Sequence, residues 1–358
     1  MSTLIPPEAL QVPPGTSYHM PDTGDQLPYA YSRFAADLLP VTKERVRTQL
    51  IACVGRPLAD KILGQDGIAE WACHVYPNGD RQRTDVLIDA GLCSLACDDE
   101  FTLTGLSTDL EQVRRRAVLY TRVLAGMAPP PDVPSAVWLA RSMADIEALS
   151  STVFSARFRR IWADINQTVP VEAEHRLTRM LPGWDEYVAF RRVNLYGYWA
   201  VAACEFSAGV DMTQLLEQHT VLRDLELAAV EHIMFTNDLY SFPKEARAGE
   251  IANTFWLLRR DGMSIQEAVD FLAEQLVTRQ DRFLALREKV RASPLGLRED
   301  VRLYLPALSY GLGGNLRYHR TTGRYHGADY DGLPITGGTV VIGERATLFR
   351  PDAPRGGQ

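Results

Sequence analysis

Three polar side chains at regular spacing constrain the fold and function of this chain more than any other sequence feature. Asn237, Ser241 and Glu245 follow one another at intervals of four residues. In an α-helix this spacing places all three on one face, one turn apart. The flanking residues 231–236 and 239–240 have the pattern of a helix that is largely buried. A polar column on a buried helix indicates a functional site more often than a solvated surface.

The oxygen atoms of this column suit a metal ion. An amide carbonyl, a hydroxyl and a carboxylate are hard ligands, and Mg²⁺ is their usual partner when substrate phosphates and water complete its coordination. Lys244 lies beside the column and is predicted to meet a phosphate as a point charge. Pro243 lacks a backbone donor and predicts a kink in the same helix.

The body of the chain has helical patterns from Tyr29 onward, with no internal repeat and no alternating strand pattern. It is therefore predicted to fold as one all-α bundle with its core between the helices. Ser264, with Glu267 three residues later, predicts a capping box at one helix start. The expected helices cover residues 35–50, 59–71, 84–97, 108–127, a pair within 135–165, one opened by 182–183, 215–239, 264–293 and 297–310, and the glycine-rich residues 311–315 predict a bend.

The two ends of the chain differ in composition from its body. Residues 1–27 are rich in Pro, Gly and polar groups and are predicted to form an irregular arm. Residues 28–326 form the expected helical domain. Residues 327–358 are predicted to be a flexible tail, with a strand-like apolar patch at 339–342.

The overall charge and composition exclude several classes of protein. A net charge of −7 argues against a general nucleic-acid surface or an anionic-membrane surface, both of which need a basic footprint. No apolar run approaches the ~20 residues that span a bilayer, and the first residues lack the pattern of a secretory signal. The five cysteines show neither a disulfide framework nor zinc-site spacing. We therefore expect a cytoplasmic protein that neither inserts into a membrane nor binds nucleic acid.

A second acidic cluster closes the apolar helix expected at 84–97. Adjacent carboxylates at Asp98, Asp99 and Glu100 are costly there unless a cation offsets them. Acidic groups at a helix C-terminus also oppose the helix dipole. The cluster is therefore predicted to bind metal, with Glu100 the weakest candidate.

Several arginines could receive an anion opposite these acidic groups. Arg191, Arg317 and Arg324 are the candidates, the last followed by Tyr325. A single arginine is more often a surface residue. Two acidic sites together with several arginines, whose forked guanidinium suits phosphate oxygens, form a coherent set for binding a diphosphate.

Four motifs together resemble those of bacterial class I terpene synthases. Residues 237–245 match the second metal motif of that family, and Asp98 lies where its aspartate-rich first motif begins. Arg191, which precedes Asn237 by 46 residues, occupies the position of the family's diphosphate-sensing arginine. Arg324 and Tyr325 match the C-terminal Arg-Tyr pair. The resemblance extends over about residues 28–326.

The first motif departs from the family pattern. Thr102 stands where the family usually has a carboxylate, four residues after Asp98. Asp98 is therefore expected to provide most of the metal binding on this side, with Asp99 beside it hydrogen-bonding an arginine. The departure puts the strength of metal binding at this motif in doubt.

The resemblance implies both a fold and a reaction. The fold is a class I terpenoid synthase bundle with a central active-site cavity, and members commonly form homodimers. The reaction is Mg²⁺-dependent ionisation of a linear prenyl diphosphate, then cyclisation to a terpene hydrocarbon or alcohol with release of diphosphate. Three Mg²⁺ ions are expected. The implied metal ligands are Asp98, Asp99, Asn237, Ser241 and Glu245, and the implied diphosphate contacts are Arg191, Lys244, Arg324 and Tyr325.

The size of the side chains along the expected cavity indicates the chain length of the substrate. Residues 92–97, just before the first motif, lack the large aromatics found in sesquiterpene cyclases. This favours geranylgeranyl diphosphate (C20) slightly over farnesyl diphosphate (C15). The expected wall residues are Leu95, Tyr196, Trp199 and Tyr318.

Two other functions remain open. A head-to-tail prenyl transferase shares the helical architecture but carries a second aspartate-rich motif in place of the column at residues 237–245. A non-catalytic prenyl-diphosphate-binding protein would be compatible with the incomplete first motif.

Overall fold

The computed structural model describes residues 2–64, 67–327 and 329–353. Within these residues the chain forms an all-α bundle, as predicted, with a few short strands in addition. The helices are α1 (Ala35–Val54), α2 (Arg56–Gly64), α3 (Ile68–Val75), α4 (Arg81–Thr102), α5 (Leu110–Leu124), α6 (Pro134–Glu147), α7 (Thr152–Thr178), α8 (Trp184–Asn194), α9 (Gly197–Ala208), α10 (Thr213–Gln218), α11 (Thr220–Ala248), α12 (Phe255–Arg260), α13 (Ile265–Arg291), α14 (Glu299–Thr321) and α15 (Gly323–His326).

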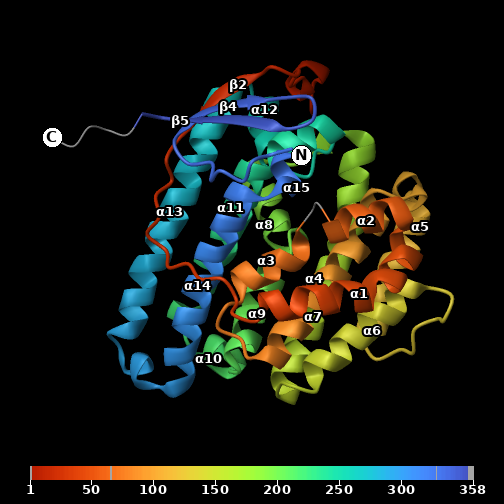
Figure 1. Cartoon of the computed structure of the whole chain (residues 1–358), viewed down its shortest axis with the longest axis vertical. Coiled ribbons are helices and arrows are strands. Elements are labelled where there is room, and N and C mark those ends of the chain that lie inside the picture. The colour runs from red at the N-terminus through yellow and green to blue at the C-terminus, as the bar shows by residue number, and fades with distance from the viewer. Residues whose placement is uncertain (1, 65–66, 328, 354–358) are drawn as a thin grey trace.

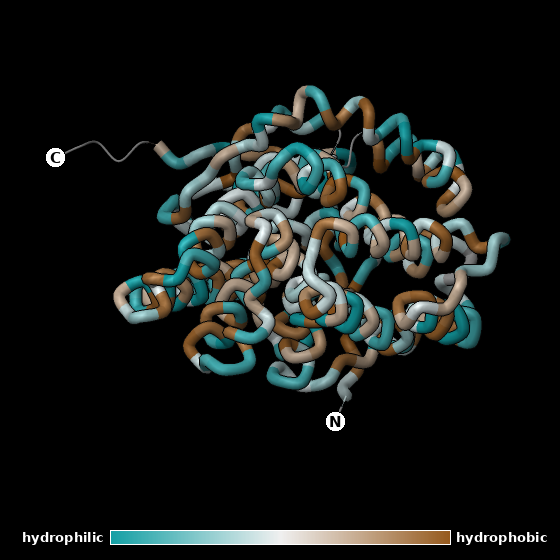
Figure 2. Tube along the Cα trace, turned by 90° about the horizontal axis from the view of Figure 1, so that it is seen from below, coloured by the Kyte–Doolittle hydropathy of each residue, from teal (hydrophilic) through white to brown (hydrophobic). Residues whose placement is uncertain are grey.

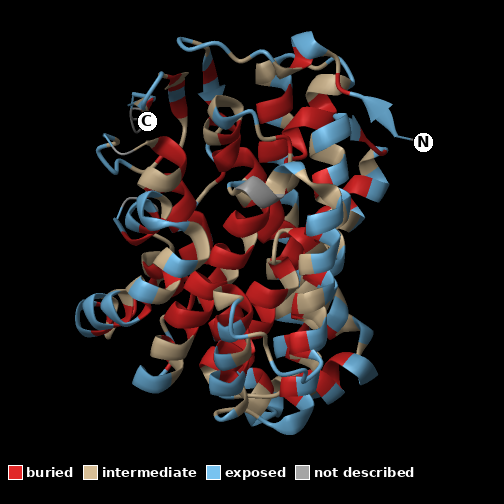
Figure 3. Ribbon diagram, turned by 90° about the vertical axis from the view of Figure 1, so that its right-hand side faces the viewer, coloured by how far each residue is buried: buried red, intermediate tan, exposed pale blue. Residues whose placement is uncertain are grey.

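The helices surround a buried centre. In Figure 1, α13 and α14 stand on one side and α1, α2, α5 and α6 on the other, with α8 and α9 between them. Hydrophilic and hydrophobic positions alternate along the helices in Figure 2, and buried positions gather along the middle of the molecule in Figure 3. The arrangement keeps the inner faces of α4, α9, α11 and α14 away from solvent, and these faces line the site described below.

Local sequence signals explain where key helices begin. Asp80 follows the turn at residues 77–78 and caps α4, because its carboxylate accepts a hydrogen bond from the Arg83 amide at 2.8 Å. The capping box predicted for Ser264 and Glu267 is present at the start of α13. The cap at Asp80 fixes the start of the helix that ends with the first acidic motif.

The ends of the chain form a small sheet that the sequence did not predict. Strand β2 (Ser17–Met20) pairs antiparallel with β4 (Gly338–Ile342), and β4 pairs with β5 (Thr347–Pro351). The patch at 339–342 is a strand, as its composition suggested, but its partner comes from the segment expected to be irregular. The remaining strands, β1 (Thr3–Leu4) and β3 (Met180–Leu181), pair with each other. Residues 338–342 and 347–351 of the expected tail are thus paired in strands.

The bend predicted at residues 311–315 is absent, because α14 continues through them to Thr321. The glycines serve close packing instead. A Cβ at Gly314 would lie 1.9 Å from the backbone oxygen of His74 in α3, and one at Gly313 would lie 2.1 Å from that of Pro28. Glycine in a helix usually weakens it, but here only glycine permits α14 to approach its neighbours. Tertiary packing outweighs local propensity at this point.

No helix in the described ranges is both long enough and apolar enough to cross a membrane. The longest, α11, has 29 residues and carries charged residues along its length. The five cysteines, all within the described residues, are free thiols.

The contact between α14 and α3 gives a stability prediction. Gly314→Ala places a methyl group against the His74 carbonyl and should lower the free energy of unfolding by about 1–3 kcal/mol, the usual cost of overpacking. Gly91→Ala in α4 is the matched control, since its Cβ meets no described atom within 4 Å. The control should raise the stability by roughly 0.5–1 kcal/mol. Urea unfolding measures both, and equal effects would contradict the packing role of Gly314.

Candidate active site

A cavity of about 230 Å³ lies inside the bundle and is lined by every site residue that the family resemblance implies except Ser241. The candidate arginine Arg317 is exposed and does not line this cavity. Polar and charged groups from α4, α8, α11 and the α14–α15 region line one part of it. The predicted wall residues Leu95, Tyr196, Trp199 and Tyr318 also line it. Sequence reasoning did not single out Trp71, Glu172, Glu250, Asn315 or His319, which line the same cavity.

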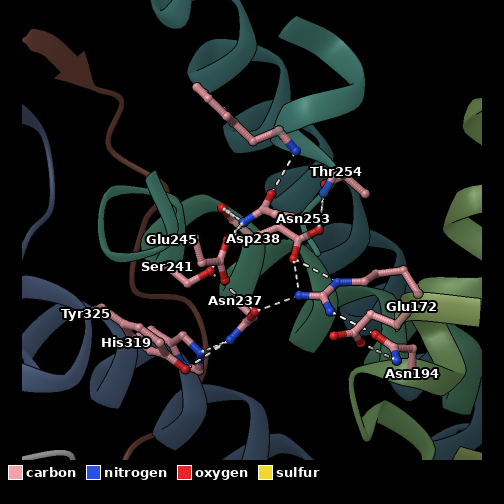
Figure 4. A network of polar contacts seen from close by, with 12 residues as sticks. Glu172, Asn194, Asn237, Asp238, Ser241, Glu245, Asn253, Thr254, His319 and Tyr325 are labelled. Atoms are coloured by element: carbon pink, nitrogen blue, oxygen red, sulfur yellow. Dashed lines mark hydrogen bonds and ion pairs between the residues drawn. The ribbon is translucent and has the colours of Figure 1, made fainter. Parts of the chain in front are cut away.

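The polar column on α11 forms as its spacing predicted (Figure 4). The Ser241 hydroxyl lies 3.5 Å from Asn237 Oδ1. Asn253, in the loop after α11, braces the column with its Nδ2, which lies 3.3 Å from Ser241 Oγ and donates to Glu245 Oε2 at 2.7 Å. Ser241 is buried behind the two residues that line the cavity. The column is therefore held in place by a residue that the sequence motif does not include.

An ion pair beneath the column joins α8 to α11. Arg191 donates from Nε and Nη2 to Asp238 Oδ1 at 3.1 and 2.9 Å. The other Asp238 oxygen accepts from the Thr254 amide at 2.9 Å and from its hydroxyl at 2.6 Å. The Asp238 side chain has no exposed surface, so both of its oxygens are satisfied by protein donors. Asp238 thereby fixes α8 and the start of α12 to α11.

Arg191 also reaches the cavity. Its Nη2 donates to Asn237 Oδ1 at 3.2 Å and its Nη1 to Asn194 Oδ1 at 3.2 Å. Asn194 in turn donates to Glu172 of α7 at 2.7 Å. The guanidinium is thus oriented on several sides by protein groups while it lines the cavity. A guanidinium held in a fixed orientation in this way is able to receive an anion.

The acidic motif on α4 faces the column across the cavity. Asp98 and Asp99 both line the cavity. Burial, reinforced by the charges of Glu172 and Asp99, raises the pKa of Asp98 to about 8. The Thr102 hydroxyl donates to the Asp98 carbonyl oxygen at 3.1 Å, as a helical threonine commonly does, so it brings no negative charge to the motif. The departure noted in the sequence therefore removes an anionic ligand from this side.

Glu100 is turned away from the cavity. Its carboxylate accepts hydrogen bonds from Arg116 and Tyr120 of α5. Those contacts fix the end of α4 against α5 and leave Asp98 and Asp99 as the acidic groups of the motif that face inward. The sequence had already made Glu100 the weakest metal candidate.

Basic and hydroxyl groups complete the polar part of the cavity. Lys244 pairs with Glu250 at 2.8 Å, and Arg324 lines the cavity nearby. The Tyr325 hydroxyl accepts from Asn237 Nδ2 at 3.0 Å, so the tyrosine of the Arg-Tyr pair contacts the column directly. The cavity therefore combines cationic groups with carboxylates, as a site for a diphosphate and metal ions requires.

His319 is a contact that the sequence did not reveal. Its Nδ1 lies 2.7 Å from the Asn315 carbonyl oxygen, which can only accept, so Nδ1 carries the proton and Nε2 accepts from Asn237 at 3.3 Å. Burial lowers the pKa of His319 to about 3 and keeps the ring neutral. Tyr325 stacks on this ring with centroids 5.0 Å apart. The position of His319, six residues before Tyr325, is the one sequence feature that could have predicted its contact with the column.

The oxygen atoms that line the cavity suit divalent cations that bind oxygens of both the protein and a substrate. Burial raises the pKa of Glu245 to about 7, against the opposing effect of Arg191. Ionising this group and Asp98 inside the protein is costly, and a nearby cation would offset that cost. In the described part of the chain no three His, Cys, Asp or Glu side chains converge as in an all-protein metal cage. Oxygen ligands on two sides of a cavity instead match Mg²⁺, which keeps water and phosphate ligands.

Comparison with known proteins identifies the family. Residues 91–282 match the sequence model of a domain described as terpene synthase family 2, C-terminal metal binding. The chain belongs to the terpene synthase family. Its domain is thus of a metal-binding kind, and its all-α fold is that of class I terpene synthases.

Individual relatives agree with this assignment. The chain is 26% identical over 268 residues to 7-epi-alpha-eudesmol synthase of Streptomyces viridochromogenes, covering 72% of this chain and 78% of that one. It is 26% identical over 219 residues to microbial terpene synthase-like protein 13 of Selaginella moellendorffii, covering 55% of this chain and 61% of that relative's length. Germacradien-4-ol synthase from Streptomyces citricolor has a similar structure, with a TM-score of 0.72 and 20% identity over 83% of this chain and 97% of that one.

The Arg191–Asp238 pair gives a second stability prediction. Asp238→Asn leaves a buried guanidinium without its counter-charge and should lower the free energy of unfolding by about 3–5 kcal/mol. Asp37→Asn, which breaks a pair with Arg81 whose side chains are 68% and 54% exposed, should cost less than ~1 kcal/mol. Denaturant titration of both variants provides the comparison, and similar losses would contradict a structural role for the buried pair.

The raised pKa values predict how metal-free protein responds to pH. The folded protein holds protons on Asp98 and Glu245 that the unfolded chain has released, so their contribution to stability is present below about pH 4 and is lost as pH rises through about 7 to 8. With EDTA present, the free energy of unfolding should fall by roughly 3–4 kcal/mol between about pH 6 and pH 8, because both carboxyl groups release their protons in this range. Asp98→Asn should flatten this slope and Mg²⁺ should reverse it. A slope unchanged by the substitution would contradict the assignment.

Proposed function

We propose that this protein is a class I terpene cyclase that ionises a linear prenyl diphosphate with the help of Mg²⁺, cyclises the resulting cation and releases diphosphate. One observation carries the proposal. A single cavity combines a polar region, formed by the α11 column and the α4 carboxylates, with apolar and aromatic walls. The polar region suits a diphosphate with its metal ions, and the walls suit a hydrocarbon chain.

The polar residues divide into two proposed groups. Asp98, Asp99, Asn237, Ser241 and Glu245 would hold the metal ions, which stabilise the negative charge that develops on the leaving diphosphate. The proposed contacts to the diphosphate itself are Arg191, Lys244, Arg324 and Tyr325. Lys244 now pairs with Glu250 at 2.8 Å and would exchange this partner for a phosphate oxygen.

The walls perform the second half of the proposed reaction. Once the carbon–oxygen bond breaks, the electron pair leaves with the diphosphate and an allylic cation remains. Aromatic faces such as those of Tyr196, Trp199 and Tyr318 stabilise positive charge at short range. The buried walls also exclude bulk water, which would otherwise quench the cation early. Ring formation then follows from the shape in which the chain is held.

For the substrate we infer farnesyl diphosphate. The expectation of a C20 substrate rested on small residues along α4, and Gly91, Ser94 and Leu95 do line the cavity. Bulky side chains from other helices, Trp71 of α3 and Trp199 of α9, line it as well and argue for a narrower cavity than the α4 residues alone suggest. A relative at 26% identity is described as cyclising (2E,6E)-farnesyl diphosphate, which supports the shorter chain.

The test is product analysis. Purified protein is incubated with Mg²⁺ and either farnesyl or geranylgeranyl diphosphate, and the products are separated by gas chromatography with mass spectrometry. Cyclic C15 products from farnesyl diphosphate, formed at least ~10-fold faster than C20 products, are expected. Longer diphosphates would indicate a prenyl transferase. Binding without turnover would indicate a non-catalytic binding protein.

The polar column on α11 gives a prediction about substitutions of the proposed metal ligands. Asn237→Ala and Glu245→Ala should each lower kcat by about 10²–10³-fold, the loss typical of removing one group that stabilises developing charge. Ser309→Ala is the control, because Ser309 is a buried α14 residue outside the cavity whose hydroxyl donates to the Leu305 carbonyl oxygen. Circular dichroism checks that all three remain folded. Wild-type turnover in either column variant would contradict the proposed metal site.

A further inference from the structure

A buried amide lies among the otherwise apolar and aromatic walls of the cavity. Asn315 on α14 is 1% exposed and lines the cavity together with Trp71 of α3. Its Nδ2 is buried and has no hydrogen-bond partner among the described residues. A buried polar group without a partner is rare in native proteins and calls for an explanation.

The orientation of this amide is fixed by its neighbour. Trp71 Nε1 lies 3.0 Å from Asn315 Oδ1. An indole nitrogen can only donate, so the amide oxygen must face Trp71 and the NH₂ group must face elsewhere. The close packing at Gly314, where α14 nearly touches the His74 backbone, brings the two helices near enough for this contact. The chain thus holds two N–H donors on Asn315 in a defined direction.

The position of Asn315 separates it from the diphosphate region. It lies one helical turn before His319, whose ring contacts Asn237 of the metal column. A turn of helix advances about 5.4 Å, so Asn315 lies farther along the cavity wall than the groups proposed to meet the diphosphate. An amide N–H beside a carbocation is unfavourable unless an acceptor lies between them. Water is the acceptor small enough to share this space with a hydrocarbon.

We propose that Asn315 positions a water molecule in the cavity and thereby makes a terpene alcohol a main product. This inference rests on the proposed cyclase function. The water oxygen accepts an N–H from Asn315 through one lone pair and forms a carbon–oxygen bond to the final cation with the other. The oxonium ion that results gives one proton to an oxygen of the released diphosphate. Asn315 is therefore a positioning residue that acts through the water.

The test is the fate of oxygen in the product. Full-length protein is incubated with Mg²⁺ and farnesyl diphosphate in ¹⁸O-labelled water, with geranylgeranyl diphosphate in parallel, and products are analysed by mass spectrometry. The wild type should yield an alcohol that carries one ¹⁸O atom as a main product. Asn315→Leu, similar in size but without a donor, should lower the ratio of alcohol to hydrocarbon by about tenfold or more. This ratio reports on water capture and does not depend on the amount of folded enzyme.

Two further variants separate positioning from packing. Trp71→Phe keeps the amide but removes the group that orients it, and should lower the same ratio by a smaller factor than Asn315→Leu. Asn315→Gln keeps the amide and should retain more alcohol than Asn315→Leu. The control Ser309→Ala should leave the ratio unchanged. These variants decide the question even if Asn315→Leu fails to fold.

The outcomes distinguish this inference from the function on which it rests. Wild-type products that are only hydrocarbons would overturn the water-positioning role and leave the cyclase function intact. An unchanged alcohol fraction in Asn315→Leu, or in Trp71→Phe, would overturn it too. Absence of turnover with both diphosphates would overturn the cyclase function and this inference with it.

Discussion

The buried ion pair between Arg191 and Asp238 is the contact on which the rest of the site depends. One Asp238 oxygen accepts the guanidinium of α8 and the other accepts two hydrogen bonds from Thr254. Because neighbouring residues in a helix point about 100° apart, fixing Asp238 beneath α11 also fixes the direction of Asn237 toward the cavity. Removing one partner of such a pair is strongly destabilising, because it leaves a buried charge without its counter-charge. Structure and proposed chemistry therefore depend on the same carboxylate.

The two acidic sides of the cavity are built differently. On the α11 side, Asn253 forms hydrogen bonds to both Ser241 and Glu245 and holds the column in place. The α4 side places Asp98 and Asp99 in the cavity, but Thr102 adds no charge and Glu100 is bound to α5. The α11 side is held rigidly and keeps all of its predicted ligands, whereas the α4 side lacks one carboxylate. We therefore propose that α11 sets the position of the metal ions and that α4 completes their coordination.

Sequence patterns predicted what depends on local periodicity. The four-residue spacing at Asn237 and the capping box at Ser264 were read correctly because a helix converts spacing directly into geometry. The partners of Asp238, and the bonds of Asn253, were not predictable, since they join segments whose proximity has no periodic signal. The glycines at 311–315 were misread as a bend because their purpose, close packing against His74 of α3 and against Pro28, depends on distant segments of the chain. The pairing of β2 with β4 joins the two ends of the chain and was missed for the same reason.

The central claim is that the α11 column and the α4 aspartates hold divalent ions around a diphosphate, and anomalous diffraction tests it most directly. Crystals grown with Mn²⁺ and inorganic diphosphate, measured near the manganese edge, locate each ion independently of the protein. We expect ions within about 2.0–2.3 Å of oxygens of Asn237, Ser241 and Glu245, and another beside Asp98. Diphosphate bound without metal at these residues, or ions bound only elsewhere, would contradict the claim.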